Sequence, residues 1–306
     1  MSRSETDGAE AMDGAAQTAV QAQTSEKAQA AELASPTRRT NGAEAIARAF
    51  DGRKAFIPFV TCGDPDMGTT LQLVRALSDA GASIIELGIP FSDPTAEGPV
   101  IQEANVRSLA NGTTTDDVLE LVRKLRQGDD FHEPVTCPLV IMTYANVVFH
   151  YGTDRFCERA AEAGIDGLIL PDVPFEEKAE FANVCEDHGL VLVSMIAPTS
   201  DERIAMIASE AKGFVYLVSS LGVTGVRSSI TTDLGSIVER IRETTDVPIA
   251  IGFGISNPEQ AKRMADLADG AIVGSAIVRI VAEHGRESVE PVREFAEGMV
   301  EALTRS

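Results

Sequence analysis

The sequence has few of the residues from which metal centres and disulfide frameworks are built. Its four cysteines and four histidines are far apart and form no C-x-x-C or Cys/His ligand pattern. It also lacks any run of 18 apolar residues and any charged-then-apolar leader at its N-terminus. These absences argue against a secreted disulfide protein and against a membrane span. We therefore expect no metal site and a cytoplasmic protein.

Lysine is scarce as well. The chain has 26 Lys and Arg, of which only six are Lys, against 47 Asp and Glu, so its formal charge is −21. Neutralising phosphates or an anionic membrane requires clustered basic residues, which argues against nucleic acid and membrane surfaces as partners. An acidic, lysine-poor surface is expected where concentrated salt screens self-repulsion. The alternative is an ordinary acidic cytosolic protein.

Residues 1–40 differ from the rest of the chain. They contain ten alanines and no aromatic residue, and their net charge is only −2, so most of the negative charge lies beyond them. Such a segment buries too little apolar surface to offset the entropy of ordering it. We expect a disordered extension over 1–40 and a folded domain over 41–306.

Short apolar runs and amphipathic stretches alternate through the folded part. The runs are nearly continuous in Val, Ile, Leu and Phe, as in parallel strands that are covered on both faces. Eight strand-then-helix units in about 260 residues predict an α/β protein with a (β/α)8 TIM barrel in one domain. A doubly wound open sheet is the alternative, but the turn after the first run has no G-x-G-x-x-G. The eight runs are 55–60, 83–87, 139–142, 167–170, 191–196, 214–218, 248–251 and 271–273.

Three carboxylates lie at predicted strand ends, where barrel enzymes carry their active sites. Glu86 interrupts an apolar strand between Ile85 and Leu87. Facing the barrel interior, it would be desolvated and its pKa raised toward neutrality, which suits proton transfer. The structural alternative is a Glu paired with Arg. Glu97 in the next loop and Asp172 after the fourth strand are further candidates, although a solvated loop charge or a turn residue is as simple a reading of each.

Glycines gather in the loops after the sixth, seventh and eighth strands, at 222–225, 252–254 and 274. They let backbone N–H groups approach a ligand, and a helix predicted to start at Ser275 would point its N-terminus at the same place. This combination predicts a site for a phosphorylated ligand, with the loop at 222–225 as a possible lid. Ordinary barrel turns are the alternative.

These segments resemble the tryptophan synthase alpha chain family. The resemblance runs in order through most of the barrel, and its most specific segment is the one that begins at Glu86. The matching segments are 59–65, 86–94, 144–149, 222–225, 252–256 and 274–278.

The resemblance implies a lyase of tryptophan biosynthesis that cleaves indole-3-glycerol phosphate to indole and glyceraldehyde 3-phosphate in a retro-aldol reaction. Glu86 matches the family's general acid/base, and Glu97 matches an aspartate that stabilises charge at the indole nitrogen; its extra methylene is a departure. A second group of matched positions lines the indole pocket in the family, and one of them, Thr224, belongs to the closing lid. A third group holds the phosphate. The pocket set is Tyr144, Tyr216, Thr224, Phe59 and Leu139, and the phosphate set is Gly225, Gly254, Gly274 and Ser275.

The resemblance also implies a partner, a PLP-dependent β subunit in an αββα assembly, and no cofactor in this chain. The residues separately favour acid/base catalysis over a Schiff-base route, because Lys54 and Lys212 precede predicted strands and so lie at the wrong end of the barrel. Two other functions stay open: a different phosphate-binding barrel enzyme, and a non-catalytic subunit that activates a β partner. A second departure, Ser220-Leu221 ahead of the lid, would affect the lid or the partner contact.

Overall fold

The structure is a computed structural model that describes residues 41–219, 234–252 and 254–304. The predicted extension, residues 1–40, lies outside this range and stays a prediction, as does the lid at 222–225. Within the described residues no helix is both long and apolar enough to cross a membrane.

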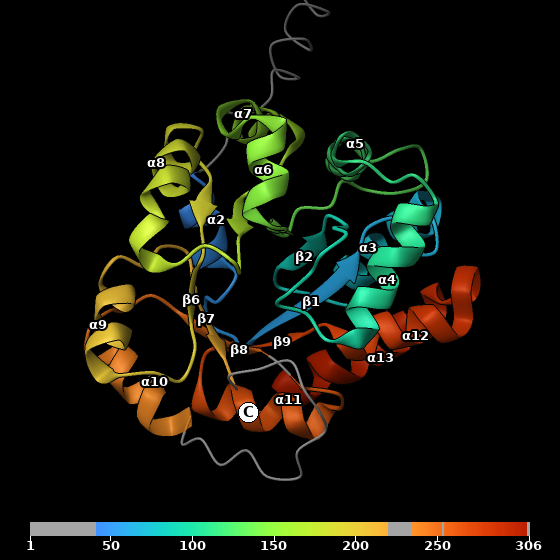
Figure 1. The fold of residues 1–306 in the computed structure, drawn as a ribbon. Helices are drawn as coiled ribbons and strands as arrows, with labels where there is room; N and C mark the ends of the chain where they lie inside the picture. The colour runs from blue at the N-terminus through green and yellow to red at the C-terminus, as the bar shows by residue number, and fades with distance from the viewer. Residues whose placement is uncertain (1–40, 220–233, 253, 305–306) are drawn as a thin grey trace, which may run out of the picture. The chain divides into compact units, whose positions relative to one another are not determined.

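Parallel strands form a closed barrel, as the alternating pattern predicts (Figure 1). The hydrogen-bonded order runs from β5 through β4, β3, β2, β1, β9, β8 and β7 to β6. β5 and β6 are two halves of one segment interrupted at Val193: the first half pairs with β4 and the second with β7, which closes the ring. The eight predicted strands and the barrel are confirmed, and an open sheet is excluded. The strands are β1 (Ala55–Thr61), β2 (Ile85–Gly88), β3 (Leu139–Met142), β4 (Gly167–Ile169), β5 (Val191–Leu192), β6 (Ser194–Ile196), β7 (Val215–Val218), β8 (Ile249–Gly252) and β9 (Gly270–Val273).

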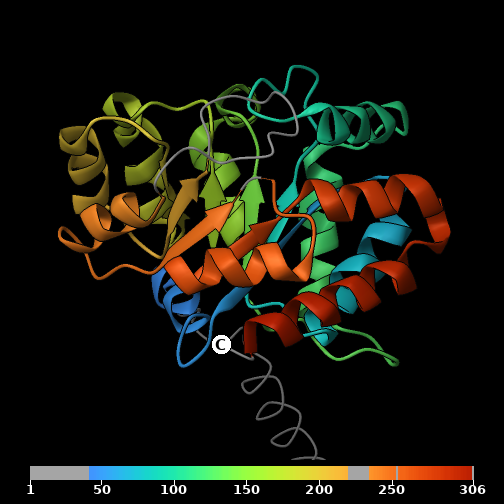
Figure 2. The same ribbon diagram turned by 90° about the horizontal axis from the view of Figure 1, so that it is seen from below.

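Helices surround the strands on the outside (Figures 1 and 2). Their ends follow ordinary capping chemistry: Thr114 and Asp117 form a capping box at the start of α5, and Asn257 accepts from Gln260 N at the start of α11. The helices are α2 (Gly42–Arg48), α3 (Met67–Asp79), α4 (Pro99–Ala110), α5 (Thr115–Gln127), α6 (Ala145–Tyr151), α7 (Thr153–Ala163), α8 (Ala179–Asp187), α9 (Asp201–Ser209), α10 (Leu234–Arg242), α11 (Pro258–Leu267), α12 (Ser275–His284) and α13 (Val289–Thr304), with short 3₁₀ turns η1 (Phe175–Glu177) and η2 (Gly285–Glu287).

Side chains alternate between two cores along each strand. One core fills the barrel interior, and a larger one lies between the strands and the outer helices. Helix α2 closes the amino end of the barrel, where Ile46, Ala49 and Phe50 join the interior core (Figure 2). The interior is therefore filled from the amino end, and the strand ends that face away from α2 are left to build a site.

Candidate active site

Glu86 occupies the interior position that the alternation in β2 assigns to it. Its strand neighbours are Phe59 on β1 and Val140 on β3, and only 1% of its surface is exposed. The buried Oε1 atom has no hydrogen-bond partner among the described residues. Burial raises the pKa of Glu86 to about 8, because no nearby donor compensates the lost hydration of the carboxylate. The predicted raised pKa is confirmed, and the described residues hold no arginine paired with it.

Glu97 is the second buried carboxyl group, with 6% of its surface exposed. The hydroxyl of Tyr144 donates to Glu97 Oε2 at 2.7 Å and accepts from the backbone N–H of Ala96 at 3.0 Å. Burial raises the pKa of Glu97 to about 7, the Tyr144 hydrogen bond lowers it, and the charge of Asp172 adds to the rise. Glu97 is therefore a fixed group inside the site rather than a solvated loop charge.

Two aromatic rings from β1 and β7 lie over glycines of the next strand. A Cβ at Gly88 would lie 2.6 Å from Cζ of Phe59, and a Cβ at Gly252 would lie 2.6 Å from the hydroxyl of Tyr216. Burial and the charges of Glu86 and Glu97 raise the pKa of Tyr216 well above its usual value. Phe59 and Tyr216 thus face the barrel interior, and Tyr216 lies within electrostatic range of both carboxyl groups. Their role in an indole pocket stays a prediction.

The prediction that Leu139 lines the pocket is wrong. Its side chain belongs to the outer core between the strands and the helices, together with Ile141, whereas Val140 faces the interior. Because side chains of a strand alternate between its faces, the position near the site is Met142, which packs against Phe59 and the interior core. The strand was identified correctly from the sequence, but the face of a continuously apolar strand was not.

Parts of two of the predicted phosphate-binding loops, those after β8 and β9, lie within the described residues, and their role stays a prediction. Gly254 has φ +78°, a conformation that favours glycine. Gly274 precedes α12, whose first residue is Ser275, and no side chain of the described residues caps this helix. The first N–H groups of α12 are therefore available to an anion. Thr224 and Gly225 lie outside the described residues.

Two residues near Glu97 have roles that the sequence did not show. Asp172, a candidate for catalysis, accepts from the backbone N–H of Ala145 at 3.1 Å and so holds the start of α6. The ring of Phe91 stacks on Tyr144 with centroids 5.0 Å apart. Phe91 directly precedes the Ser-Asp-Pro turn, and no pattern in the sequence singled it out. Both residues support Tyr144, which in turn holds Glu97.

The two lysines excluded from Schiff-base chemistry lie where the sequence places them. Lys54 precedes β1 and donates to the carbonyl of Ala268 at 2.6 Å, and Lys212 precedes β7 and donates to Glu186 at 2.8 Å. Among the described residues, no group of three or more His, Cys, Asp and Glu side chains could hold a metal ion.

A closed parallel barrel with two buried carboxyl groups and an uncapped helix N-terminus at the carboxyl ends of its strands has the arrangement of a TIM-barrel enzyme. Comparison with known proteins identifies the family within this class of enzymes. The family model described as "Tryptophan synthase alpha chain" matches residues 46–304, and the chain belongs to that family of lyases.

Individual relatives agree with this assignment. The tryptophan synthase alpha chain of Caldanaerobacter subterraneus is 46% identical over 84% of this chain and 99% of its own length. That of Lactiplantibacillus plantarum is 47% identical, over 84% and 96%. The crystal structure of the alpha subunit from Legionella pneumophila has a TM-score of 0.76 and 34% identity, covering 88% of this chain and 100% of its own. The tryptophan synthase complex of Pyrococcus furiosus gives 0.72 and 35%, over 81% and 98%.

Proposed function

We propose that this chain cleaves indole-3-glycerol phosphate to indole and glyceraldehyde 3-phosphate, with Glu86 and Glu97 as its catalytic groups. The observation that supports it best is the pair of buried carboxyl groups in different surroundings. Glu86 has no hydrogen bond at its buried Oε1 atom and a pKa of about 8, whereas Glu97 accepts from Tyr144 and has a pKa of about 7. Two buried carboxyl groups in different surroundings can divide acid and base roles.

In the proposed reaction Glu86 is protonated near neutral pH and donates its proton to C3 of the indole ring. Its carboxylate then takes the proton of the glycerol hydroxyl next to the breaking bond. The C–C bond breaks, its electron pair returns to the ring, and the aldehyde forms. Meanwhile Glu97, as a carboxylate, stabilises the positive charge that develops at the ring N–H. Protons balance over the cycle, because the one given to carbon is recovered from the hydroxyl.

The other parts of the site bind the substrate in this proposal. Phe59, Tyr216 and Met142 enclose the indole ring, and the backbone around Gly254, Gly274 and Ser275 holds the phosphate. A helix N-terminus and glycine N–H groups bind an anion without a basic side chain, which suits a chain of formal charge −21. We assign the lid role to Thr224 and Gly225 from the family resemblance alone.

The proposal is tested by assaying indole release from indole-3-glycerol phosphate with the purified chain. We expect slow release alone and faster release when a tryptophan synthase β subunit is added. A chain that releases no indole in either case, yet accelerates the β reaction, would instead be a non-catalytic activator. The same experiment tests the partner, which we propose to be a PLP-dependent β subunit in an αββα assembly, with no cofactor needed in this chain.

The composition leads to two further proposals. The described cysteines are all free, which agrees with a reducing compartment, and we place the protein in the cytoplasm. We also attribute the excess of acidic residues to work in concentrated salt. The relatives give no support for this adaptation, so it rests on composition alone. Indole release and the unfolding midpoint, measured at low and at molar salt, should both fall when salt is removed; indifference to salt would contradict it.

A further inference from the structure

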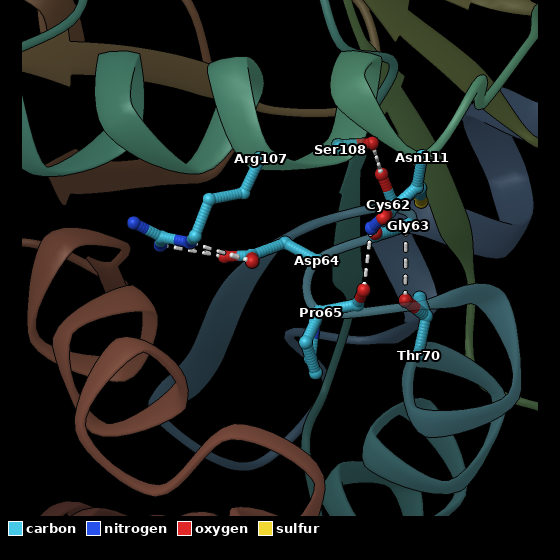
Figure 3. Close-up of polar contacts among 8 residues, drawn as sticks. All are labelled: Cys62, Gly63, Asp64, Pro65, Thr70, Arg107, Ser108 and Asn111. Carbon is cyan, nitrogen blue, oxygen red and sulfur yellow. Dashed lines mark hydrogen bonds and ion pairs between the residues drawn. The ribbon is translucent and has the colours of Figure 1, made fainter.

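An ion pair joins the loop after β1 to helix α4, beside the candidate active site. Arg107 donates from Nε to Asp64 Oδ1 at 2.9 Å and from Nη2 to Oδ2 at 2.8 Å (Figure 3). Only 2% of the Asp64 surface is exposed. A two-bond contact of this kind fixes the direction of the partners as well as their separation.

Two neighbours on α4 hold the same loop. Ser108 donates to the carbonyl of Cys62, and Asn111 donates to the carbonyls of Gly63 at 3.2 Å and Pro65 at 2.6 Å (Figure 3). There is no spare room in this contact, since a Cβ at Gly63 would lie 2.5 Å from Ser108 Oγ. We call the contacts of Arg107, Ser108 and Asn111 with residues 62–65 the α4 clamp.

Helix α4 connects this clamp to both carboxyl groups. At its first turn, Gln102 donates to the backbone carbonyl of Glu97 at 2.8 Å, so α4 holds the backbone of that residue. In its middle, Ala104 belongs to one buried apolar cluster with Phe59, the strand neighbour of Glu86, and Val278 of α12. A rotation of α4 would therefore move Glu97 relative to Glu86 and to the start of α12.

We propose that Asp64 and Arg107 are positioning residues that orient α4 and thereby set the place of Glu97 relative to Glu86. The inference rests on the proposed function. Neither residue is needed to touch substrate in this role. The pair is only partly buried, since 37% of the Arg107 side chain is exposed, and a partly exposed ion pair contributes little to the free energy of unfolding. What the two-bond pair supplies is a fixed orientation between the loop and the helix.

The test compares Arg107→Lys with a matched control at the other end of the barrel. Lysine keeps the charge and loses the two-bond geometry. The control is Arg126→Lys: Arg126 donates to Asp166 at 2.7 Å, in a pair with 17% and 14% of the side chains exposed, and also donates to three backbone carbonyls, those of Val135, Cys137 and Gly164. We expect kcat for indole release to fall about tenfold or more in Arg107→Lys with KM within about twofold, since small misplacements of a catalytic group are costly. Arg126→Lys should lower the unfolding midpoint and leave kcat within about twofold of wild type.

A second readout needs no turnover. Titration of the Glu97 carboxyl, followed by carbon NMR in glutamate-labelled protein and assigned by its absence in Glu97→Gln, should shift in Arg107→Lys and not in Arg126→Lys. A wild-type chain that releases no indole would contradict the proposed function and still leave this titration as a test of the clamp.

Three results would overturn the inference: a folded Arg107→Lys chain with unchanged kcat, a change in KM alone, or an equal loss of kcat in both variants. If Arg107→Lys does not fold, Asp64→Asn replaces it, since asparagine is close in size to aspartate and removes the charge that Arg107 binds. The same loss of kcat is expected, and an unchanged kcat would overturn the inference.

Discussion

The two ends of the barrel use the same kind of side chain in opposite ways. At the amino end, Asp166 precedes β4 and accepts from Leu139 N at 3.0 Å and from Arg126. Asp269 precedes β9 and likewise accepts from Ile249 N at 2.9 Å and from Arg242. Each carboxylate joins the start of its strand to the start of a neighbouring strand.

At the carboxyl end, Asp64 is paired with Arg107, but the two carboxyl groups of the candidate site are buried with less compensation. Glu86 has a buried oxygen without a described partner, and Glu97 has one tyrosine hydroxyl as its side-chain partner. Leaving a buried polar group unsatisfied costs free energy, so this end is less stable than it could be. The comparison indicates that the amino end holds the barrel together, while the carboxyl end keeps raised pKa values that chemistry can use.

The largest effect on activity should come from replacing the Glu86 carboxyl group, which carries the proton that is transferred. Glu86→Gln should lower indole release by about 10²–10⁴-fold, the usual contribution of a general acid/base, while binding of a non-cleavable phosphorylated analogue is retained. Asp166→Asn is the control from the amino end, which should lose stability and keep its turnover per folded molecule. Full activity in Glu86→Gln would contradict the mechanism, and equal losses in both variants would remove the distinction between the ends.

Stability should depend on pH through the same residue. Its pKa is about 8 in the folded chain against 4.5 for an unperturbed glutamate, so the folded state binds more protons between these values. The free energy of unfolding should therefore fall as pH rises from 4.5 to 8, by roughly 3 to 5 kcal/mol from Glu86 alone. Urea unfolding from pH 5 to 9 should show a shallower fall in Glu86→Gln. Identical slopes in the two proteins would mean that Glu86 is not buried as described.

Substitutions at two glycines, one at each end of the barrel, should affect activity and stability separately, and by smaller amounts. In Gly88→Ala the new Cβ would displace the Phe59 ring, and we expect kcat/KM to fall about tenfold, equivalent to about 1.4 kcal/mol. In Gly42→Ala the new Cβ would lie 2.0 Å from the carbonyl oxygen of Asp166 at the amino end. That clash should lower the free energy of unfolding by about 1–3 kcal/mol without changing kcat/KM of the folded chain. A loss of stability alone in Gly88→Ala, with a loss of kcat/KM alone in Gly42→Ala, would contradict the roles given to the two ends.

The smallest of these effects concerns the extra methylene of Glu97. Aspartate would withdraw the carboxylate from the Tyr144 hydroxyl, now at 2.7 Å. We expect kcat of Glu97→Asp to fall severalfold, about the 0.5–1.5 kcal/mol of one hydrogen bond, with a similar loss in Tyr144→Phe. The double variant should lose little more than either single one. A large gain in rate for Glu97→Asp would show instead that this position is poorly tuned here.

Much of this arrangement was predictable from single residues. Glu86 interrupts an apolar strand, and that alone predicted a buried carboxyl group with a raised pKa. The Gly-rich turns likewise predicted a helix N-terminus after β9. Leu139 was placed wrongly because, in a strand that is apolar at every residue, no local signal distinguishes the interior face from the outer face. Phe91 and the α4 clamp were missed because their partners lie far away in the chain.

The sequence by itself determined the order of strands and helices, the barrel and the carboxyl group at Glu86, because periodicity, capping and burial of an isolated charge are local properties. Only the tertiary structure decided which face of β3 meets the interior, that Tyr144 holds Glu97, and that Asp64 and Arg107 join β1 to α4. Those contacts depend on how closure of the barrel brings distant segments together. Closure also places Asp166 and Asp269 beside arginines at the amino end, and Glu86 and Glu97 at the carboxyl end without an arginine partner among the described residues.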